Sequence, residues 1–136
     1  MDSTYGLVAS SEGVRWLEKA REHLHLAKLA LDNGIYSLSC FHSQQAAETA
    51  LKGVLIAFAG VHLLTHSLVK LVEEVAVIKS LRLPSKDRLE ELEDHYLQAR
   101  YPNARLSSYS FDEAESAYKT AEEVVDECSK LFAENR

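Results

Sequence analysis

The chain has 136 residues, a formal net charge of −6 and 46% hydrophobic residues. A chain of this length buries a core without disulfides or metal, so we expect one domain over residues 1–136 with its core at about 11–132. The acidic balance disfavours nucleic-acid binding by a bulk basic face, but it leaves room for a local basic pocket. Cys40 and Cys128 lie within apolar helical patterns, which predicts small buried thiols and a reducing compartment.

Two features of the sequence argue against a membrane or secreted location. The longest apolar stretch, GVLIAFAGVHLL, contains His62 and is about a dozen residues long, whereas a membrane-spanning helix needs about 20. The amino-terminal MDSTYGLVAS lacks the basic start and long apolar run of a signal peptide. We therefore expect a cytoplasmic protein that has no membrane partner.

The apolar positions repeat at spacings of three and four along most of the chain, and no run alternates as a strand would. The sequence therefore predicts an all-α protein. The expected helices run from about Ser11 to Leu31, from Tyr36 to Ala59, from an N-cap at Thr65 to the break at Leu83-Pro84-Ser85, from there to Arg100-Tyr101-Pro102, and from Ser110 onward. The last helix has the clearest start, because Ser110 and Glu113 fit a capping box.

The second expected helix has several distinct faces. One face carries only small residues: Ser39, Ser43, Ala46, Ala50, Gly53, Ala57 and Gly60. Such a face allows close approach of another helix, either a neighbour in the bundle or the same face of a second subunit. Another face is apolar except for Gln45, Glu48 and Lys52. Glu48 and Lys52 are either a partly exposed ion pair at the core edge or part of a polar pocket or subunit seam.

Four segments, taken in order, resemble the HEPN domain (higher eukaryotes and prokaryotes nucleotide-binding) family. They are Trp16-Leu17 with Ala20; Asn33-Gly34 followed by Tyr36, Phe41, Gln44-Gln45-Ala46-Ala47-Glu48 and Ala50-Leu51-Lys52; Thr65-His66-Ser67-Leu68; and Arg100-Tyr101-Pro102. In the third segment Ser67 stands where the family pattern has an acid. The resemblance covers about residues 13 to 130.

The resemblance implies a prokaryotic-type, five-helix up-and-down bundle with a long antiparallel helix pair. It also implies a homodimer and, as a possible partner, a small nucleotidyltransferase in a toxin–antitoxin-like pair. Some family members are metal-independent ribonucleases that use an arginine and a histidine a few residues apart. Here no histidine follows Arg100, which weakens that expectation for this chain.

Three groups of residues are candidates for chemistry. Arg88 and His95, with six residues between them, match the arginine–histidine pattern formally and share a helix face. His66 is expected in the first turn of a helix, where free backbone N–H groups attract anions. Alternatively, His66 simply caps the helix or packs there. Arg100, Tyr101 and Arg105 flank a proline-bearing turn and suit phosphate contact plus base stacking, or alternatively close the end of a helix.

These observations lead to one main hypothesis and two alternatives. The main hypothesis is a small helical binding module for a nucleotide-like ligand or nucleic acid, with ligand-binding residues Gln45, Glu48, Lys52, His66, Arg100, Tyr101 and Arg105. One alternative is a metal-independent endoribonuclease, with Arg88, His95 and Arg100 as candidate catalytic residues. The other is a purely structural bundle. No metal-ligand or cofactor motif is present in the sequence, so we expect neither a metal site nor a cofactor.

Overall fold

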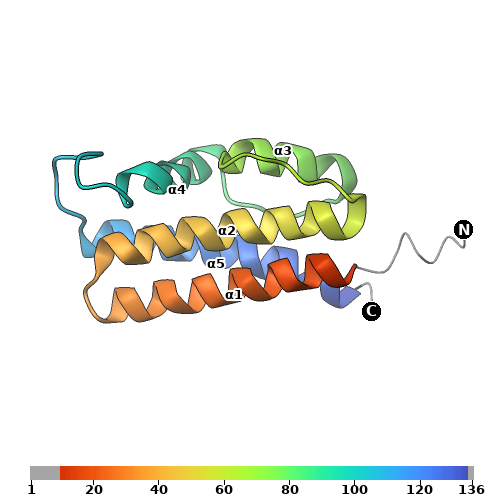
Figure 1. The fold of residues 1–136 in the computed structure, drawn as a ribbon, viewed down its shortest axis with the longest axis horizontal. Coiled ribbons are helices and arrows are strands. Elements are labelled where there is room, and N and C mark those ends of the chain that lie inside the picture. Colours follow the sequence, from red (N-terminus) through yellow and green to blue (C-terminus); the bar gives the residue numbers. More distant parts are fainter. Residues whose placement is uncertain (1–9, 135–136) are drawn as a thin grey trace, which may run out of the picture.

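The computed structural model describes residues 10–134, which form five helices and, within that range, no strand (Figure 1). The helices are α1 (Ser11–Asp32), α2 (Tyr36–Ala59), α3 (Leu68–Ile78), α4 (Lys86–Gln98) and α5 (Phe111–Glu134). The predicted all-α class is confirmed. The predicted second helix has the observed bounds, and its carboxyl end is closed by Gly60 in the left-handed conformation, at φ 65°.

Helix α2 lies at the centre of the bundle and contacts all four other helices. It forms a long antiparallel hairpin with α1, while α5 runs along both (Figure 1). The two shorter helices, α3 and α4, lie one after the other along another side of α2. The α1–α2 turn and the α4–α5 connection therefore lie at the same end of the molecule. No helix within the described residues is long and apolar enough to cross a membrane.

The small-residue face of α2 packs against α1 within the chain, so the bundle-neighbour interpretation is confirmed. A Cβ added at Gly13 would lie 2.4 Å from the Ala57 Cβ, and one added at Gly53 would lie 3.1 Å from the Trp16 Cβ. Ser39 donates a hydrogen bond to the Ala27 carbonyl at 2.8 Å. The two helix backbones therefore approach closely at Gly13 and Gly53, which leaves the other side of α2 to face α3 and α4.

Both predicted ends of the third helix are wrong. The N-cap is Ser67, whose hydroxyl accepts from the Lys70 N–H at 3.2 Å, whereas the Thr65 hydroxyl only closes a local turn onto the Ser67 N–H. The helix ends at Ile78, well before the expected break at Pro84, and Lys79 is extended. Beyond it the backbone is held by α5, because the Glu127 carboxylate accepts from the Arg82 N–H at 2.9 Å.

The predicted capping box at the start of α5 is confirmed. The Ser110 hydroxyl accepts from the Glu113 N–H at 3.2 Å, and the Glu113 carboxylate accepts from the Ser110 N–H at 3.3 Å. Glu113 also receives both terminal nitrogens of Arg105 at 2.9 Å. The side chain of Arg105 thus fastens the α4–α5 connection to the helix that follows it.

Cys40 and Cys128 are free and buried, as predicted. Burial raises the pKa of the Cys40 thiol to about 12, and it raises the pKa of Cys128 as well. Both thiols are therefore protonated and act as small apolar side chains in the core.

Candidate ligand-binding site

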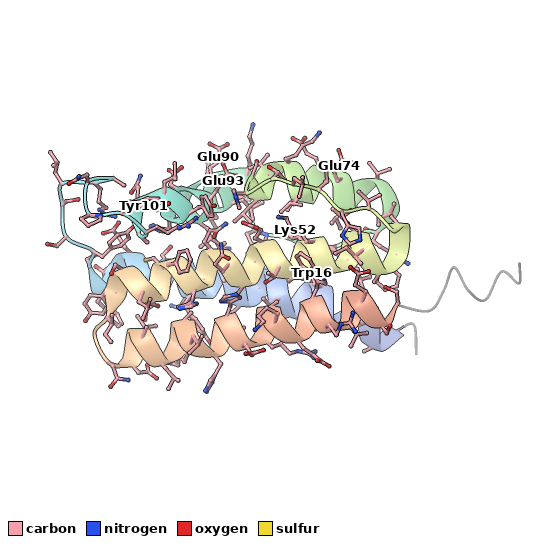
Figure 2. The ribbon with its side chains drawn as sticks, in the orientation of Figure 1. Trp16, Lys52, Glu74, Glu90, Glu93 and Tyr101 are labelled. Atoms are coloured by element: carbon pink, nitrogen blue, oxygen red, sulfur yellow. The ribbon has the colours of Figure 1, made fainter. Side chains whose placement is uncertain are left out.

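The polar residues that interrupt α2 form one hydrogen-bonded network centred on the Glu48 carboxylate. Glu48 Oε1 accepts from Gln44 Nε2 at 2.9 Å and lies 3.0 Å from His66 Nδ1, while Oε2 accepts from Lys52 Nζ at 3.0 Å. The side chains of Glu48 and Lys52 are only 7% and 11% exposed. Glu48 is therefore buried, whereas Lys52 keeps a small exposed part and lies on the side of α2 that faces α3 (Figure 2).

The protonation state of Glu48 follows from two opposing effects. Burial raises the pKa of this carboxyl, but the hydrogen bonds from Gln44, His66 and Lys52 outweigh burial and leave the pKa lowered. Glu48 is therefore ionised at neutral pH, and each of its oxygens is already hydrogen-bonded inside the protein. Gln45 does not contact Glu48 directly; its Nε2 donates to Gln44 Oε1 at 2.6 Å, and Gln44 in turn donates to Glu48.

The imidazole of His66 connects this network to Arg100 through the ring of Tyr96. His66 stacks on the ring of Tyr96, with centroids 3.7 Å apart and an interplanar angle of 18°. The Arg100 guanidinium lies 4.7 Å from the centroid of the same ring, and it also lies near the rings of Tyr101 (5.3 Å) and Phe41 (5.9 Å). Tyr96 therefore joins two candidates that are far apart in the sequence.

Helix α3 does not offer the anion site expected at His66. His66 lies before the helix rather than in its first turn. The Glu93 carboxylate accepts from the Leu68 and Val69 N–H groups at 2.7 and 3.5 Å, so a side chain of α4 already occupies this helix terminus.

A groove of about 570 Å³ opens between the start of α2 and the α4–α5 connection. Its walls carry two arginines, three tyrosines and three serines: Arg100, Arg105, Tyr36, Tyr101, Tyr109, Ser37, Ser107 and Ser108. The volume falls within the range of about 300–1,000 Å³ that ligand pockets occupy. Tyr101 is 51% exposed and stands at this end of the bundle (Figure 2). The groove thus combines cations with aromatic faces.

The two arginines of the groove differ in what they already bind. Arg105 makes the bidentate ion pair with Glu113 and lies 3.9 Å from the Tyr109 ring centroid, so the pKa of Arg105 is raised further by that pairing. By contrast, no carboxylate of residues 10–133 pairs with Arg100, which is exposed. Arg100 is thus the cation of the groove that has both hydrogen-bonding capacity and access to solvent.

Arg88 and His95 both line a small cavity of about 40 Å³ between α4 and α5. Both side chains make their contacts with other residues of the bundle. Arg88 donates to Thr120 at 3.0 Å and pairs with Glu123. His95 is 6% exposed, and its Nδ1 lies 3.0 Å from the Tyr109 hydroxyl. Burial lowers the pKa of His95 to about 4, so this imidazole is neutral near pH 7.

Sequence reasoning singled out neither Tyr96 nor Tyr109 as site residues. For Tyr96 a usable signal exists, because it stands four residues before Arg100 and residues at this spacing share a helix face. Nothing near Tyr109 in the sequence predicts its contact with His95. Within residues 10–134, no three histidine, cysteine, aspartate or glutamate side chains come together as metal ligands.

The fold and the groove define a small all-α protein whose central, mainly apolar helix carries a buried polar network and which has an arginine–tyrosine groove at one end. The HEPN domain family matches residues 14–131, and the chain belongs to this family. It is 30% identical over 124 residues to "Putative toxin MJ1304" of Methanocaldococcus jannaschii, covering 82% of each chain.

Solved structures of similar proteins agree with this assignment. TT1696 from Thermus thermophilus has a TM-score of 0.78 at 29% identity, over 90% of this chain and 99% of that one. ST0689, an archaeal HEPN homologue, has a TM-score of 0.66 at 28% identity, over 88% and 97%. A HEPN domain protein of Thermotoga maritima has a TM-score of 0.67 at 26% identity, over 88% and 98%.

Proposed function

We propose that this HEPN domain is a binding module that holds a nucleotide-like ligand or nucleic acid in the groove of Arg100, Tyr101 and Arg105. The observation that carries the proposal is Arg100, an exposed guanidinium beside three aromatic rings that has no carboxylate partner in residues 10–133. A guanidinium binds phosphate oxygens through two parallel hydrogen bonds, and an exposed tyrosine stacks on a base. A nucleotide carries its phosphate and its base on one sugar, so neighbouring residues such as Arg100 and Tyr101 suit the two groups.

The remaining predicted site residues have different roles in this proposal. Arg105 and its partner Glu113 stabilise the wall of the groove. His66 lies beside the groove, because it stacks on Tyr96, whose ring also contacts Arg100. Gln45, Glu48 and Lys52 support His66 rather than contact the ligand: Lys52 and His66 both contact the Glu48 carboxylate, and Gln45 donates to Gln44.

Binding is tested by thermal unfolding with a panel of nucleotides and short single-stranded RNA. A ligand that binds the folded state raises Tm. We expect Arg100→Ala to abolish the rise and Tyr101→Ala to reduce it. Arg15→Ala, which removes an exposed arginine from α1, is the matched control and should leave the rise intact. An unchanged Tm of the parent protein at millimolar ligand counts against the proposal.

Assembly is a separate part of the proposal. The family resemblance supports a homodimer and a small nucleotidyltransferase partner, and MJ1304, by its name a toxin candidate, supports a toxin–antitoxin-like setting. Sedimentation velocity over a hundredfold concentration range tests the dimer, and a monomer throughout would remove it. Co-expression with a neighbouring nucleotidyltransferase gene, followed by affinity purification, tests the partner.

Ribonuclease activity is the second candidate, because the family resemblance implies it for some members and MJ1304 is by its name a toxin candidate. The pair of Arg88 and His95 is poorly suited, since a proton-transferring histidine needs access to the substrate and a pKa near the working pH. We therefore expect His95→Phe to leave any RNA cleavage in EDTA unchanged and Arg100→Ala to abolish it. Absence of cleavage by the parent protein removes this candidate.

A further inference from the structure

The contact between Glu48 and His66 fixes which nitrogen of His66 carries hydrogen. An ionised carboxylate only accepts hydrogen bonds, so the 3.0 Å contact with Glu48 Oε1 requires hydrogen on His66 Nδ1. In the neutral imidazole, Nε2 is then the unprotonated nitrogen and a hydrogen-bond acceptor. Stacking on Tyr96 fixes the plane of the ring, so the direction of this acceptor is fixed as well.

The charge of Glu48 is balanced without a positive charge on His66. Lys52 supplies that balance through its 3.0 Å contact with Oε2, and Gln44 fills another acceptor position on Oε1. The part of His66 in the network is to donate through Nδ1. What it offers to a ligand is an acceptor at Nε2, and its side chain is 50% exposed.

The surroundings of His66 favour a hydroxyl over a phosphate. His66 lines a second groove, of about 540 Å³, together with Glu93, Asp94, Tyr96 and Gln98. Two carboxylates in this wall repel phosphate, whereas they tolerate a neutral hydrogen-bond donor. This acceptor groove adjoins the Arg100 groove, because Gln98 lines both and Tyr96 contacts both His66 and Arg100.

We propose that His66 Nε2 accepts a hydrogen bond from a ribose hydroxyl of the bound nucleotide, so that His66 makes the protein prefer ribonucleotides to deoxyribonucleotides. The inference rests on the proposed binding at Arg100. With phosphate on Arg100 and base on Tyr101, the sugar hydroxyls are the donors of a nucleotide that remain beside the phosphate. Glu48 acts as a positioning residue through its hold on His66 Nδ1.

The test measures binding of ADP, 2′-deoxy-ADP and 3′-deoxy-ADP by isothermal titration calorimetry. Since one hydrogen bond contributes a net of about 1 kcal/mol, we expect at least one deoxy analogue to bind about fivefold more weakly than ADP. His66→Phe keeps a ring against Tyr96 but has no acceptor. It should weaken ADP to the level of that analogue and leave the analogue unchanged.

Two further variants separate the role of His66 from simple structural effects. His62→Phe changes an exposed histidine of the same connection, which pairs with Glu12, and should keep the full preference for ADP. Glu48→Gln should reduce the preference while circular dichroism shows an intact fold. If ADP and both analogues bind the parent protein equally, or if His66→Phe keeps the preference, the inference is overturned while binding at Arg100 stands. If none of the three binds, the inference about the sugar is overturned, and the proposed function fails as well if the panel of nucleotides and RNA leaves Tm unchanged.

Discussion

Replacing Glu48 with alanine tests whether the polar residues of α2 hold the bundle together. The substitution removes three hydrogen bonds and leaves Lys52, with 11% of its side chain exposed, without its counter-charge. Breaking a buried ion pair on one side costs about 3–5 kcal/mol. Since Lys52 retains a narrow route to solvent, we place the loss near the lower end, at about 3 kcal/mol, or roughly 10 °C in Tm.

The assay is urea unfolding, followed by the fluorescence of Trp16, the only tryptophan of the chain. The matched control is the double variant Glu48→Leu with Lys52→Met, which removes both charges together. We expect it to recover stability to within about 1 kcal/mol of the parent protein, because apolar side chains of similar volume replace a buried pair at little cost. A loss below about 1 kcal/mol for Glu48→Ala alone would refute this reasoning, because the pair would then contribute no more than an ion pair on the surface does.

Three other predictions follow from single contacts. Burial lowers the pKa of His95 to about 4 from 6.5, so its neutral ring contributes stability, up to about 3 kcal/mol, above pH 6.5 that is lost as the pH falls toward 4. His95→Phe should flatten the urea midpoint over that pH range, and an unchanged slope contradicts the assignment. Gly13→Ala should destabilise by about 1–2 kcal/mol despite the higher helix propensity of alanine, because the added Cβ would lie 2.8 Å from the Ala57 Cα and 2.9 Å from the Gly53 carbonyl oxygen; since these backbone contacts persist, adding Ala57→Gly should not restore the urea midpoint, and a full recovery would contradict the assignment. Cys40 and Cys128 should react with a thiol reagent only in denaturant; rapid labelling of the native protein would show that they are not buried.

The parts of the fold that sequence predicted well are those whose determinants are local. The second helix is closed by Gly60, and the start of α5 is closed by Ser110 and Glu113, all within a few residues of the helix end. The third helix was misjudged because its ends depend on Glu93 and Glu127, which lie 25 and 45 residues away from the backbone groups that they bind. No pattern read along a short window contains such contacts.

The candidate site divides in the same way. Arg88 and His95 were correctly placed on one helix face, but only the packing of α4 against α5 turns that face inward. Arg100 and Tyr101 are neighbours in sequence, so their joint position in the groove could be anticipated. The approach of His66 to Arg100 through Tyr96 depends on how α4 docks on the segment before α3.

The Glu93 carboxylate at the amino end of α3 has a consequence for folding. The Leu68 and Val69 N–H groups gain this partner only after α4 has docked, so α3 and α4 should form as one cooperative unit rather than in succession. Their amide hydrogens should then exchange with solvent at the rate at which α4 detaches. These two amides would serve as natural reporters of how often the wall that carries Tyr96 and Arg100 opens.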